Sequence, residues 1–477
     1  MNGKHFIMVL LCKSLTFILL FIWISLSSCE KNVIAVENAK TETTPDTENE
    51  EADQEETAEP AESESKKIIL SGDAEGKLVI DGNSKKYDCQ TAIVVQGGAY
   101  TSIQIKNLKG QEGCPIRITN DGLVEMIGFR KHMQISDVSH VSISGDGDVG
   151  IKRGFLFRDN EYRAITLDGA INNLRVTHIE FKNIGNYVIS YNSDKIYDGS
   201  PDSYASNLTF SYLTANNTGA LINFGGGING SAIQGLIKNL EVSYVTFTNS
   251  PTVRNAVYVG IAMDYHIHHN EFRDVNMRED NHNAMFFLRG NGRFYDNYVN
   301  GHQGNALRAW GVSIGTTPKE ILVYNNIVVN SRKYSAFEVQ SFENDMVSGK
   351  TTFINAKIFH NTCGNLNLSR DWYGVVVDAY RLFGGSCQVF NNLAFNLPSP
   401  HPTSNFVSYM SIEKDMLTAW NNLYFKTSKA AGIVDEQEFK LDGASPAKGH
   451  GKKTALVTRD FYNKSRNNDA PSVGAVE

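Results

Sequence analysis

The sequence lacks the motifs that mark most cofactor and nucleic-acid sites. It has only six cysteines in 477 residues, with no CxxC pair and no histidine-rich spacing that would indicate a zinc site. There is no Walker A motif and no GxGxxG turn between a strand and a helix, so neither a nucleotide nor haem is expected. No basic run lies outside the N-terminal segment, so nucleic acid is not an expected partner.

The cysteines are also too few and too scattered for a disulfide framework. The four beyond the N-terminal segment are Cys89, Cys114, Cys363 and Cys387. Cys89 and Cys114 are able to pair in an oxidising compartment, and the sequence leaves open whether they do.

The one long hydrophobic run, residues 15–26, is too short for a membrane-spanning helix. Basic residues flank its start, which predicts a signal peptide over residues 1–28. The run ends in Leu26-Ser27-Ser28-Cys29, which resembles the lipobox of bacterial lipoproteins. The resemblance implies a mature chain that begins at a lipidated Cys29, in an outer-membrane lipoprotein that faces the periplasm or the cell surface. An ordinary signal peptide with a chance cysteine is the alternative.

The next segment, to about residue 66, is acidic and almost free of large apolar side chains from residue 37 on. Such a composition cannot bury enough surface to offset the loss of chain entropy, which predicts a disordered tether over residues 29–66. Residues 30–65 carry 13 acidic side chains against two lysines, so the net charge of −7 reflects this segment. The rest of the chain is near neutral, and the acidic pI gives no information about its partner.

The length alone would suggest two or three domains, but internal repeats indicate a single repetitive domain. A short phrase recurs at intervals of 27 to 35 residues, with an asparagine at one equivalent position: Asn270, Asn297, Asn326, Asn361, Asn392 and Asn422. The phrases alternate with period two and are rich in β-branched and aromatic residues, which excludes a helical solenoid, and the leucine-rich repeat pattern is absent. We therefore predict that residues 67–477 form an all-β, single-stranded right-handed parallel β-helix of roughly ten or more coils.

Both ends of this domain fit the same fold. Residues 99–120 resemble the opening coils of secreted β-helix proteins of Bacteroidetes-type bacteria. Residues 441–477, with a Ser-Pro-Ala phrase and a final Gly-Ala-x-Glu, resemble their closing segment, which we place at about 430–477. The chain is thus similar to lipoproteins of the pectate-lyase-like β-helix superfamily. That fold hosts many functions, so the resemblance does not select a chemistry.

The repeated asparagine has a structural explanation. Amides stacked in one column of coils each donate to one neighbour and accept from the other. In three upstream repeats an apolar residue stands at the same place: Ile179, Leu213 and Val245. We predict a buried asparagine ladder and give it no catalytic role.

A second strand follows each asparagine phrase, and aligning these strands predicts which side chains face outward. The aligned segments are residues 255–260, 283–289, 305–311, 335–340 and 373–380. The core column then reads Val257, Met285, Leu307, Phe337 and Val375. One outward column reads Tyr258, Phe286, Arg308, Glu338 and Val376, and the next reads Gly260, Leu288, Trp310, Gln340 and Asp378. A slip of one residue in any coil would invert the facing.

Aromatic and ionisable side chains concentrate on this outward face and on the bends before it. Five are candidate substrate contacts: Tyr258, Phe286, Trp310, His282 and Gln340. Five are candidate catalytic groups: Arg308, Lys333, His302, Glu338 and Asp378. The structural alternative for Arg308 and Glu338 is an ion pair between adjacent coils, worth about 0–1 kcal/mol when exposed.

The leading hypothesis is a polysaccharide lyase. Such an enzyme removes the proton next to a uronate carboxylate with a base and neutralises that carboxylate with a cation. Ala306-Leu307-Arg308 resembles the Leu-x-Arg phrase of alginate- and chondroitin-type lyases, which implies that Arg308 neutralises charge while Lys333 or His302 acts as the base. The lysine and acidic calcium phrases of those families are absent, as is the Arg-x-Pro-x-x-Arg phrase of pectate lyases. No metal ligand is therefore assigned, and Ca²⁺ stays open as a cofactor.

Two alternatives remain. Glu338 and Asp378, on adjacent coils and two residues apart along the strand, would lie about 8 Å apart, which suits an inverting glycoside hydrolase. A tethered monomeric solenoid with an aromatic face would also suit adhesion to a glycan without cleavage. All three hypotheses have an extracellular polysaccharide as the partner.

Overall fold

The computed structural model describes residues 66–399, 407–410 and 416–477, with only the backbone described for 407–410. The signal peptide, the lipidated Cys29 and most of the tether were predicted over residues 1–65 and lie outside these ranges. The described chain is all-β and contains no α-helix. Its short 3-10 turns are η1 (Pro201–Ser203), η2 (Glu343–Asp345) and η4 (Lys429–Ala431).

No helix in the described ranges has the length and apolar character needed to cross a bilayer.

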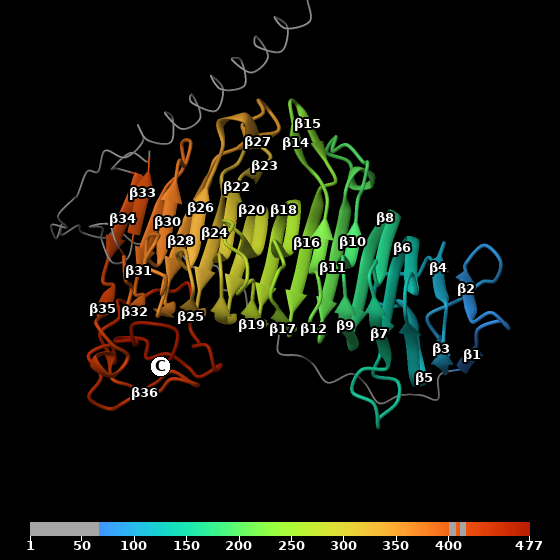
Figure 1. Cartoon of the computed structure of the whole chain (residues 1–477). Helices are drawn as coiled ribbons and strands as arrows, with labels where there is room; N and C mark the ends of the chain where they lie inside the picture. The colour runs from blue at the N-terminus through green and yellow to red at the C-terminus, as the bar shows by residue number, and fades with distance from the viewer. Residues whose placement is uncertain (1–65, 400–406, 411–415) are drawn as a thin grey trace, which may run out of the picture. The chain divides into compact units, whose positions relative to one another are not determined.

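The strands form parallel ladders in which each strand pairs with its equivalent in the next coil, so this unit is a parallel β-helix (Figure 1). Its handedness and number of coils stay predictions. Ladder 1 contains β2 (Lys77–Asp81), β4 (Ser102–Lys106), β6 (His132–Ser144), β8 (Ile165–Thr177), β10 (Tyr187–Tyr191), β13 (Ala220–Phe224), β18 (Asn255–His268), β20 (Ala284–Tyr295), β22 (Asn305–Gly311), β26 (Phe337–Gln340), β30 (Val377–Tyr380) and β33 (Val407–Met410).

Two further ladders complete each coil, and the longer strands bend from one ladder into another. Ladder 2 contains β1 (Lys66–Leu70), β3 (Thr91–Ala99), β5 (Ile116–Ile127), the second halves of β6, β8, β18 and β20, and β11 (Ala205–Ser211), β16 (Ile237–Ser243), β24 (Lys319–Tyr324), β28 (Ile354–Phe359), β31 (Cys387–Phe390) and β34 (Leu417–Trp420). Ladder 3 contains the ends of β3 and β5 and then β7 (Phe155–Asn160), β9 (Ile179–Ile184), β12 (Thr214–Asn216), β17 (Thr246–Ser250), β19 (Glu271–Val275), β21 (Tyr298–His302), β25 (Ile327–Ser331), β29 (Thr362–Gly364), β32 (Leu393–Phe395) and β35 (Leu423–Phe425).

Three antiparallel strand pairs lie outside the ladders. They are β14 (Gly227–Asn229) with β15 (Ala232–Gln234), β23 (Ser313–Ile314) with β27 (Thr351–Thr352), and β36 (Ile433–Asp435) with β37 (Lys440–Leu441). The first two project from the same edge of the coils, at the top of Figure 1. Lys350 Nζ in the second donates to the backbone oxygen of Ser231 in the first at 2.9 Å.

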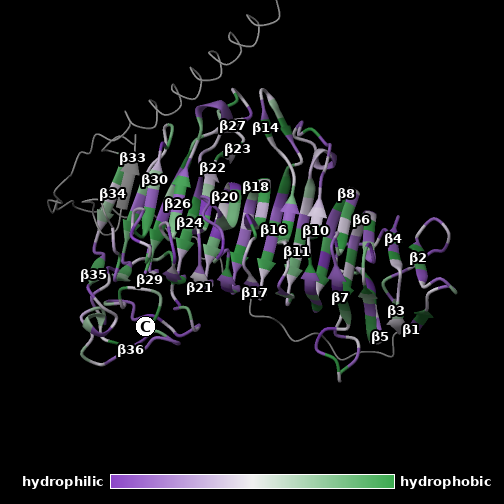
Figure 2. Cartoon of the chain, viewed as in Figure 1, coloured by the Kyte–Doolittle hydropathy of each residue, from purple (hydrophilic) through white to green (hydrophobic). Residues whose placement is uncertain are grey.

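Period-two alternation places the apolar side chains inside the coils. In β24, for example, Ile321 and Val323 are fully buried while Lys319, Leu322 and Tyr324 between and beside them are partly exposed. Figure 2 shows the same alternation of hydrophobic and hydrophilic residues along many of the strands. The result is one continuous apolar core that runs through all three ladders.

The predicted asparagine ladder is confirmed. Asn297 Nδ2 donates to Asn326 Oδ1 at 3.0 Å, and the amides of the neighbouring coils repeat this bond at 2.9 Å. The residue before each ladder asparagine has a left-handed φ of 50° to 55°, which turns the chain between ladders 2 and 3. The three apolar equivalents upstream are buried: Ile179, Leu213 and Val245.

The sulfurs of Cys89 and Cys114 form a disulfide, and Cys363 and Cys387 are buried free thiols.

Candidate active site

Three ionisable side chains form one outward column of ladder 1. Arg308 on β22 pairs with Glu338 on β26, and Glu338 pairs with Asp378 on β30. Successive strands of a sheet lie about 4.8 Å apart, so the three side chains follow one another on adjacent coils. Arg308 and Glu338 therefore occupy the neighbouring positions that the sequence predicted.

The diagonal placement of Asp378 is wrong. Phe337 pairs with Val377, so this coil is shifted by two residues from the predicted register. The shift arises in a run of three fully buried valines, Val375 to Val377, where alternation cannot fix the register; a shift of two residues leaves Asp378 facing outward as predicted. Glu338 and Asp378 consequently stand directly opposite each other, and the predicted separation of about 8 Å along the diagonal does not apply.

Glu338 lies at the centre of the column with both carboxylate oxygens engaged. Its Oε1 accepts hydrogen bonds from Arg308 Nε at 2.9 Å and from Gln340 Nε2 at 2.6 Å. Its Oε2 lies 2.8 Å from His282 Nε2. Burial raises the pKa of Glu338, but the bond from His282 and the charge of Arg308 outweigh this effect and hold the pKa below its ordinary value. Glu338 is therefore ionised at neutral pH.

Asp378 contrasts with Glu338. The residue is 3% exposed, and its Oδ1 has no hydrogen-bond partner among the described residues. Burial and the adjacent charge of Glu338 raise the pKa of Asp378 to about 7, against an opposing effect of Arg308. A carboxyl with this pKa exchanges its proton near neutral pH, as an acid or base catalyst must.

Arg308 and His282 bond to each other as well as to Glu338. Arg308 Nη1 donates to the backbone oxygen of His282 at 2.8 Å. His282 Nε2 also lies 2.9 Å from Asn305 Oδ1. Because both neighbours of Nε2 are acceptors, this nitrogen carries a proton. The ion pair expected for Arg308 and Glu338 is present, and it belongs to a larger network of hydrogen bonds.

Aromatic rings enclose His282. It stacks on Tyr334 with ring centroids 4.2 Å apart and an angle of 6° between the planes. The Trp372 ring is tilted relative to both rings, and its centroid lies 6.1 Å from that of His282 and 5.3 Å from that of Tyr334. The sequence analysis did not identify Trp372, although its position beside Asp371, just before an aligned strand, was a usable signal.

Lys333 is placed as a cation and not as a base. Its Nζ lies 3.2 Å from Asp371 Oδ2 and 3.7 Å from Asp280 Oδ1. Burial lowers the pKa of Lys333, but the hydrogen bond to Asp371 and the charges around it outweigh this effect, so the pKa ends above its ordinary value. Lys333 is therefore protonated at neutral pH and cannot accept a proton, contrary to the role predicted for it.

His302 is also unsuited to the predicted role of base. It is fully buried at the end of β21, and its Nδ1 lies 2.9 Å from the backbone oxygen of Gly304. Burial lowers its pKa to about 4, against an opposing effect of the bond to Gly304. The residue does not reach the outward face where a substrate would bind.

On the outward face, the structure has Phe287 at the position where the sequence predicted Phe286. Phe287, and not Phe286, follows Tyr258 in the column, and their rings stack with centroids 5.0 Å apart. Phe286 is fully buried in the core, where it packs on Phe272 and Phe294. The five consecutive apolar residues of this coil, 284–288, gave no alternation from which to read the facing.

Two further predicted contact residues, Trp310 and Gln340, lie in the neighbouring outward column. Trp310 meets the edge of Phe287 with centroids 4.6 Å apart and is partly exposed. Gln340 is 6% exposed, and its amide donates a hydrogen bond to Glu338. It therefore positions that carboxylate and offers little surface to a substrate.

No cluster of three or more His, Cys, Asp or Glu side chains with the arrangement of a metal site occurs in the described part of the chain.

No protein-family model and no curated protein matches the chain. Among solved structures it is similar to the PL6 family alginate lyase AlyGC, at 13% identity and a TM-score of 0.38, over 73% of this chain and 51% of that one. It is also similar to the PL6 family polysaccharide lyase Pedsa3628 from Pseudopedobacter saltans, at 12% identity and a TM-score of 0.41, over 86% and 99% of the two chains. A third similar structure is the pectate lyase Pel9A, at 12% identity and a TM-score of 0.37, over 84% of this chain and 96% of that one. The chain thus spans about half the length of AlyGC, and at these scores its activity has to be argued from its own residues.

Proposed function

We propose that this protein is a polysaccharide lyase that cleaves a uronate-containing glycan on the outward face of ladder 1. The observation that carries the proposal is the column of Arg308, Glu338 and Asp378, in which one carboxyl is bonded on both oxygens and the other has a pKa of about 7. β-Elimination requires one proton-transfer group and one cation for the uronate carboxylate, and Asp378 and Arg308 supply them.

In this proposal Asp378 removes the proton from the carbon next to the carboxylate. A C=C bond forms as the glycosidic C–O bond on the adjacent carbon breaks, and the leaving oxygen takes up the proton that Asp378 received. Arg308 bonds through Nε and Nη1, and its Nη2 has no hydrogen-bond partner among the described residues, so it is available to the uronate. Glu338 positions Arg308 and His282 and does not take part in proton transfer. Because Asp378 is only 3% exposed, substrate access requires the side chains that cover it to move.

A hydrolase with two catalytic carboxyls receives less support. An inverting enzyme needs carboxyls about 6.5–9.5 Å apart with one of them free to activate water. Glu338 and Asp378 are directly opposite on adjacent strands, and hydrogen-bond partners occupy both oxygens of Glu338.

The test is a substrate panel. The purified whole chain is incubated with alginate, pectate, glucuronate-bearing glycans and neutral polysaccharides, and absorbance near 235 nm records unsaturated products. We expect unsaturated products from at least one uronate polymer and loss of this activity in Asp378→Asn. New reducing ends without the absorbance would establish a hydrolase, and binding without any product would establish a glycan-binding protein.

We also propose that the chain is held at the outer membrane by lipid on Cys29, with the glycan substrate outside the cytoplasm. The support is the Leu26-Ser27-Ser28-Cys29 motif and the acidic segment that follows it. A disulfide between Cys89 and Cys114 is compatible with an oxidising compartment.

A further inference from the structure

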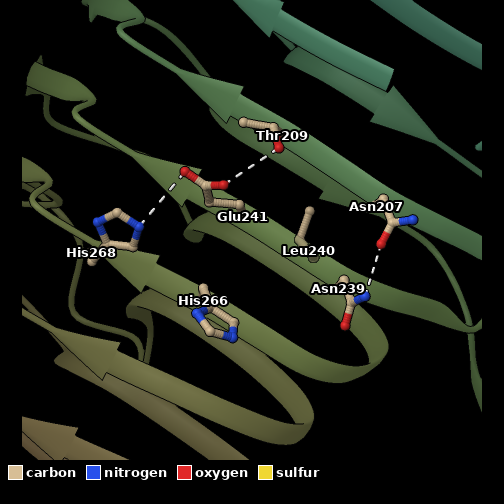
Figure 3. Close-up of a pocket in the computed structure, with 7 residues that line it drawn as sticks. All are labelled: Asn207, Thr209, Asn239, Leu240, Glu241, His266 and His268. Atoms are coloured by element: carbon tan, nitrogen blue, oxygen red, sulfur yellow. Dashed lines mark hydrogen bonds and ion pairs between the residues drawn. The ribbon is translucent and has the colours of Figure 1, made fainter. Parts of the chain in front are cut away.

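A concave site lies on ladder 2, whereas the column of Arg308, Glu338 and Asp378 lies on ladder 1. It is a shallow depression of about 330 Å³ across β11, β16 and the second half of β18, at the small end of the range for ligand pockets. Figure 3 shows the residues that line it: Asn207, Thr209, Asn239, Leu240, Glu241, His266 and His268. The proposed lyase reaction uses none of them.

Glu241 is the only formally charged group in this lining. Its Oε1 accepts from Ser243 Oγ at 2.7 Å, and its Oε2 accepts from Thr209 Oγ1 at 3.4 Å. No lysine or arginine forms an ion pair with Glu241 among the described residues, and 39% of its side chain is exposed. The carboxylate therefore keeps acceptor capacity on the side that faces the depression.

His268 lies beside Glu241 at a distance that leaves room for a third group. His268 Nε2 is 3.7 Å from Glu241 Oε1, which is too long for a direct hydrogen bond. A single oxygen atom can lie within hydrogen-bond distance of both atoms. Such an oxygen would donate to Glu241 and accept from the N–H of His268, which is the bonding pattern of a hydroxyl group.

The histidines contribute no positive charge. Burial, with a smaller effect of the neighbouring rings of His269 and His266, which would repel a protonated His268, lowers the pKa of His268 to about 3. His268 Nδ1 lies 2.9 Å from His269 Nδ1, so one of these nitrogens donates to the other. When His269 donates, the remaining proton of the neutral His268 is on Nε2, directed at Glu241. Burial and the charge of Arg293 also lower the pKa of His266.

Amide groups form the opposite side of the depression. Asn239 Nδ2 donates to Asn207 Oδ1 at 2.8 Å, in a short exposed ladder along the rim. These amides present both donors and acceptors, as a polyhydroxylated ligand requires. The lining as a whole combines neutral hydrogen-bonding groups with one carboxylate that forms no ion pair with a lysine or arginine of the described residues, and Arg293 lies next to His266 on the following coil.

We propose that this depression binds a neutral sugar residue of a glycan chain through its hydroxyl groups. One hydroxyl bridges Glu241 and His268, and others contact the amides of Asn239 and Asn207. A uronate or sulfated residue should bind more weakly than a neutral one, because its charge would face Glu241. Binding at this site does not depend on the lyase reaction proposed for ladder 1. The site would hold a neutral part of the polysaccharide whether or not the protein is a lyase.

The test is binding of defined oligosaccharides to the whole chain. Neutral oligosaccharides of glucose, galactose, mannose and xylose, and the corresponding galacturonate oligosaccharides, are compared by saturation-transfer NMR and titration calorimetry. We expect one neutral series to bind, and its affinity to fall at least tenfold in Glu241→Gln and in His268→Ala. Glu320→Gln is the matched control, because Glu320 lies on the same ladder and pairs with Lys357 at 2.7 Å.

Melting curves check that each variant folds. If Glu241→Gln or His268→Ala melts earlier, Asn239→Gly replaces it, since Asn239 is exposed and its φ of 56° suits glycine. The proposal is overturned if no neutral oligosaccharide binds, if binding persists in the pocket variants, or if only the galacturonate series binds and does so through Glu241. Loss of lyase activity with intact neutral-sugar binding would affect the proposed function alone.

Discussion

Asp378 and Glu338 stand directly opposite each other on adjacent coils, but only Glu338 has Arg308 and His282 as hydrogen-bond partners among the described residues. Two carboxyls in such proximity cannot both ionise easily, and Asp378, whose Oδ1 has no partner among the described residues, retains its proton to higher pH. This asymmetry assigns proton transfer to Asp378 and a positioning role to Glu338.

The first prediction concerns Asp378→Asn. The substitution keeps the shape of the side chain and removes its proton exchange, so turnover should fall at least about a hundredfold. In the unmodified protein activity should rise with pH through about 7, because the base form of Asp378 appears there. Asp371→Asn is the control, and a comparable loss of turnover in it would argue that the effect is not specific to Asp378.

The second prediction concerns stability and pH. The pKa of Asp378 is about 7 in the folded protein and about 3.9 in an unfolded chain. The folded state therefore binds more protons between these values, and the contribution of Asp378 to the free energy of unfolding falls as pH rises from about 4 to about 7. Asp378→Asn should flatten this decline, as followed by chemical denaturation at several pH values. Identical pH profiles for both proteins would show that the carboxyl is not shifted.

The third prediction compares Arg308 with Lys333. Arg308→Gln should lower turnover about a hundredfold or more, because the uronate carboxylate loses its cation. Lys333→Met should lower it less than about tenfold, because Lys333 is an ion-paired cation and not the base. Steady-state kinetics on the same uronate polymer measures both. A larger loss in Lys333→Met than in Arg308→Gln would return the role of base to Lys333.

The fourth prediction concerns the asparagine ladder. Asn326→Asp would place a carboxyl where Nδ2 now donates to Asn361 Oδ1 at 2.9 Å, and leave buried acceptors facing each other. We expect a loss of several kcal/mol in the free energy of unfolding. The control is Asn217→Asp, since Asn217 is exposed and its left-handed φ of 52° tolerates aspartate. Equal melting temperatures for the two variants would contradict a stabilising role for the ladder.

The fifth prediction concerns the anchor. Cys29→Ala should leave the precursor uncleaved or the mature chain without acyl groups, because the lipobox cysteine carries the lipid. Intact-mass spectrometry and detergent partitioning of the membrane fraction measure this. An unchanged mass shift and partitioning in the variant would show that another segment holds the protein at the membrane.

The sequence by itself determined the architecture and the asparagine ladder. A repeat near 30 residues with period-two alternation leaves few folds that bury the apolar face, and an asparagine at the equivalent position of successive repeats, as at Asn297, Asn326 and Asn361, allows one stacked column. It also placed Arg308 and Glu338 on adjacent coils, because both of their strands alternate cleanly.

Only the tertiary structure decided the facing of Phe286 and the register of Asp378. Both follow runs in which every residue is apolar, so alternation gave no register, and the packing of Phe286 on Phe272 and of Val377 beside Phe337 fixed it. The same holds for the chemistry: the burial of His302 and the partners of Lys333 depend on coils and loops far apart in the chain. Protonation depends on desolvation and neighbouring charge, and neither is visible until the coils are stacked.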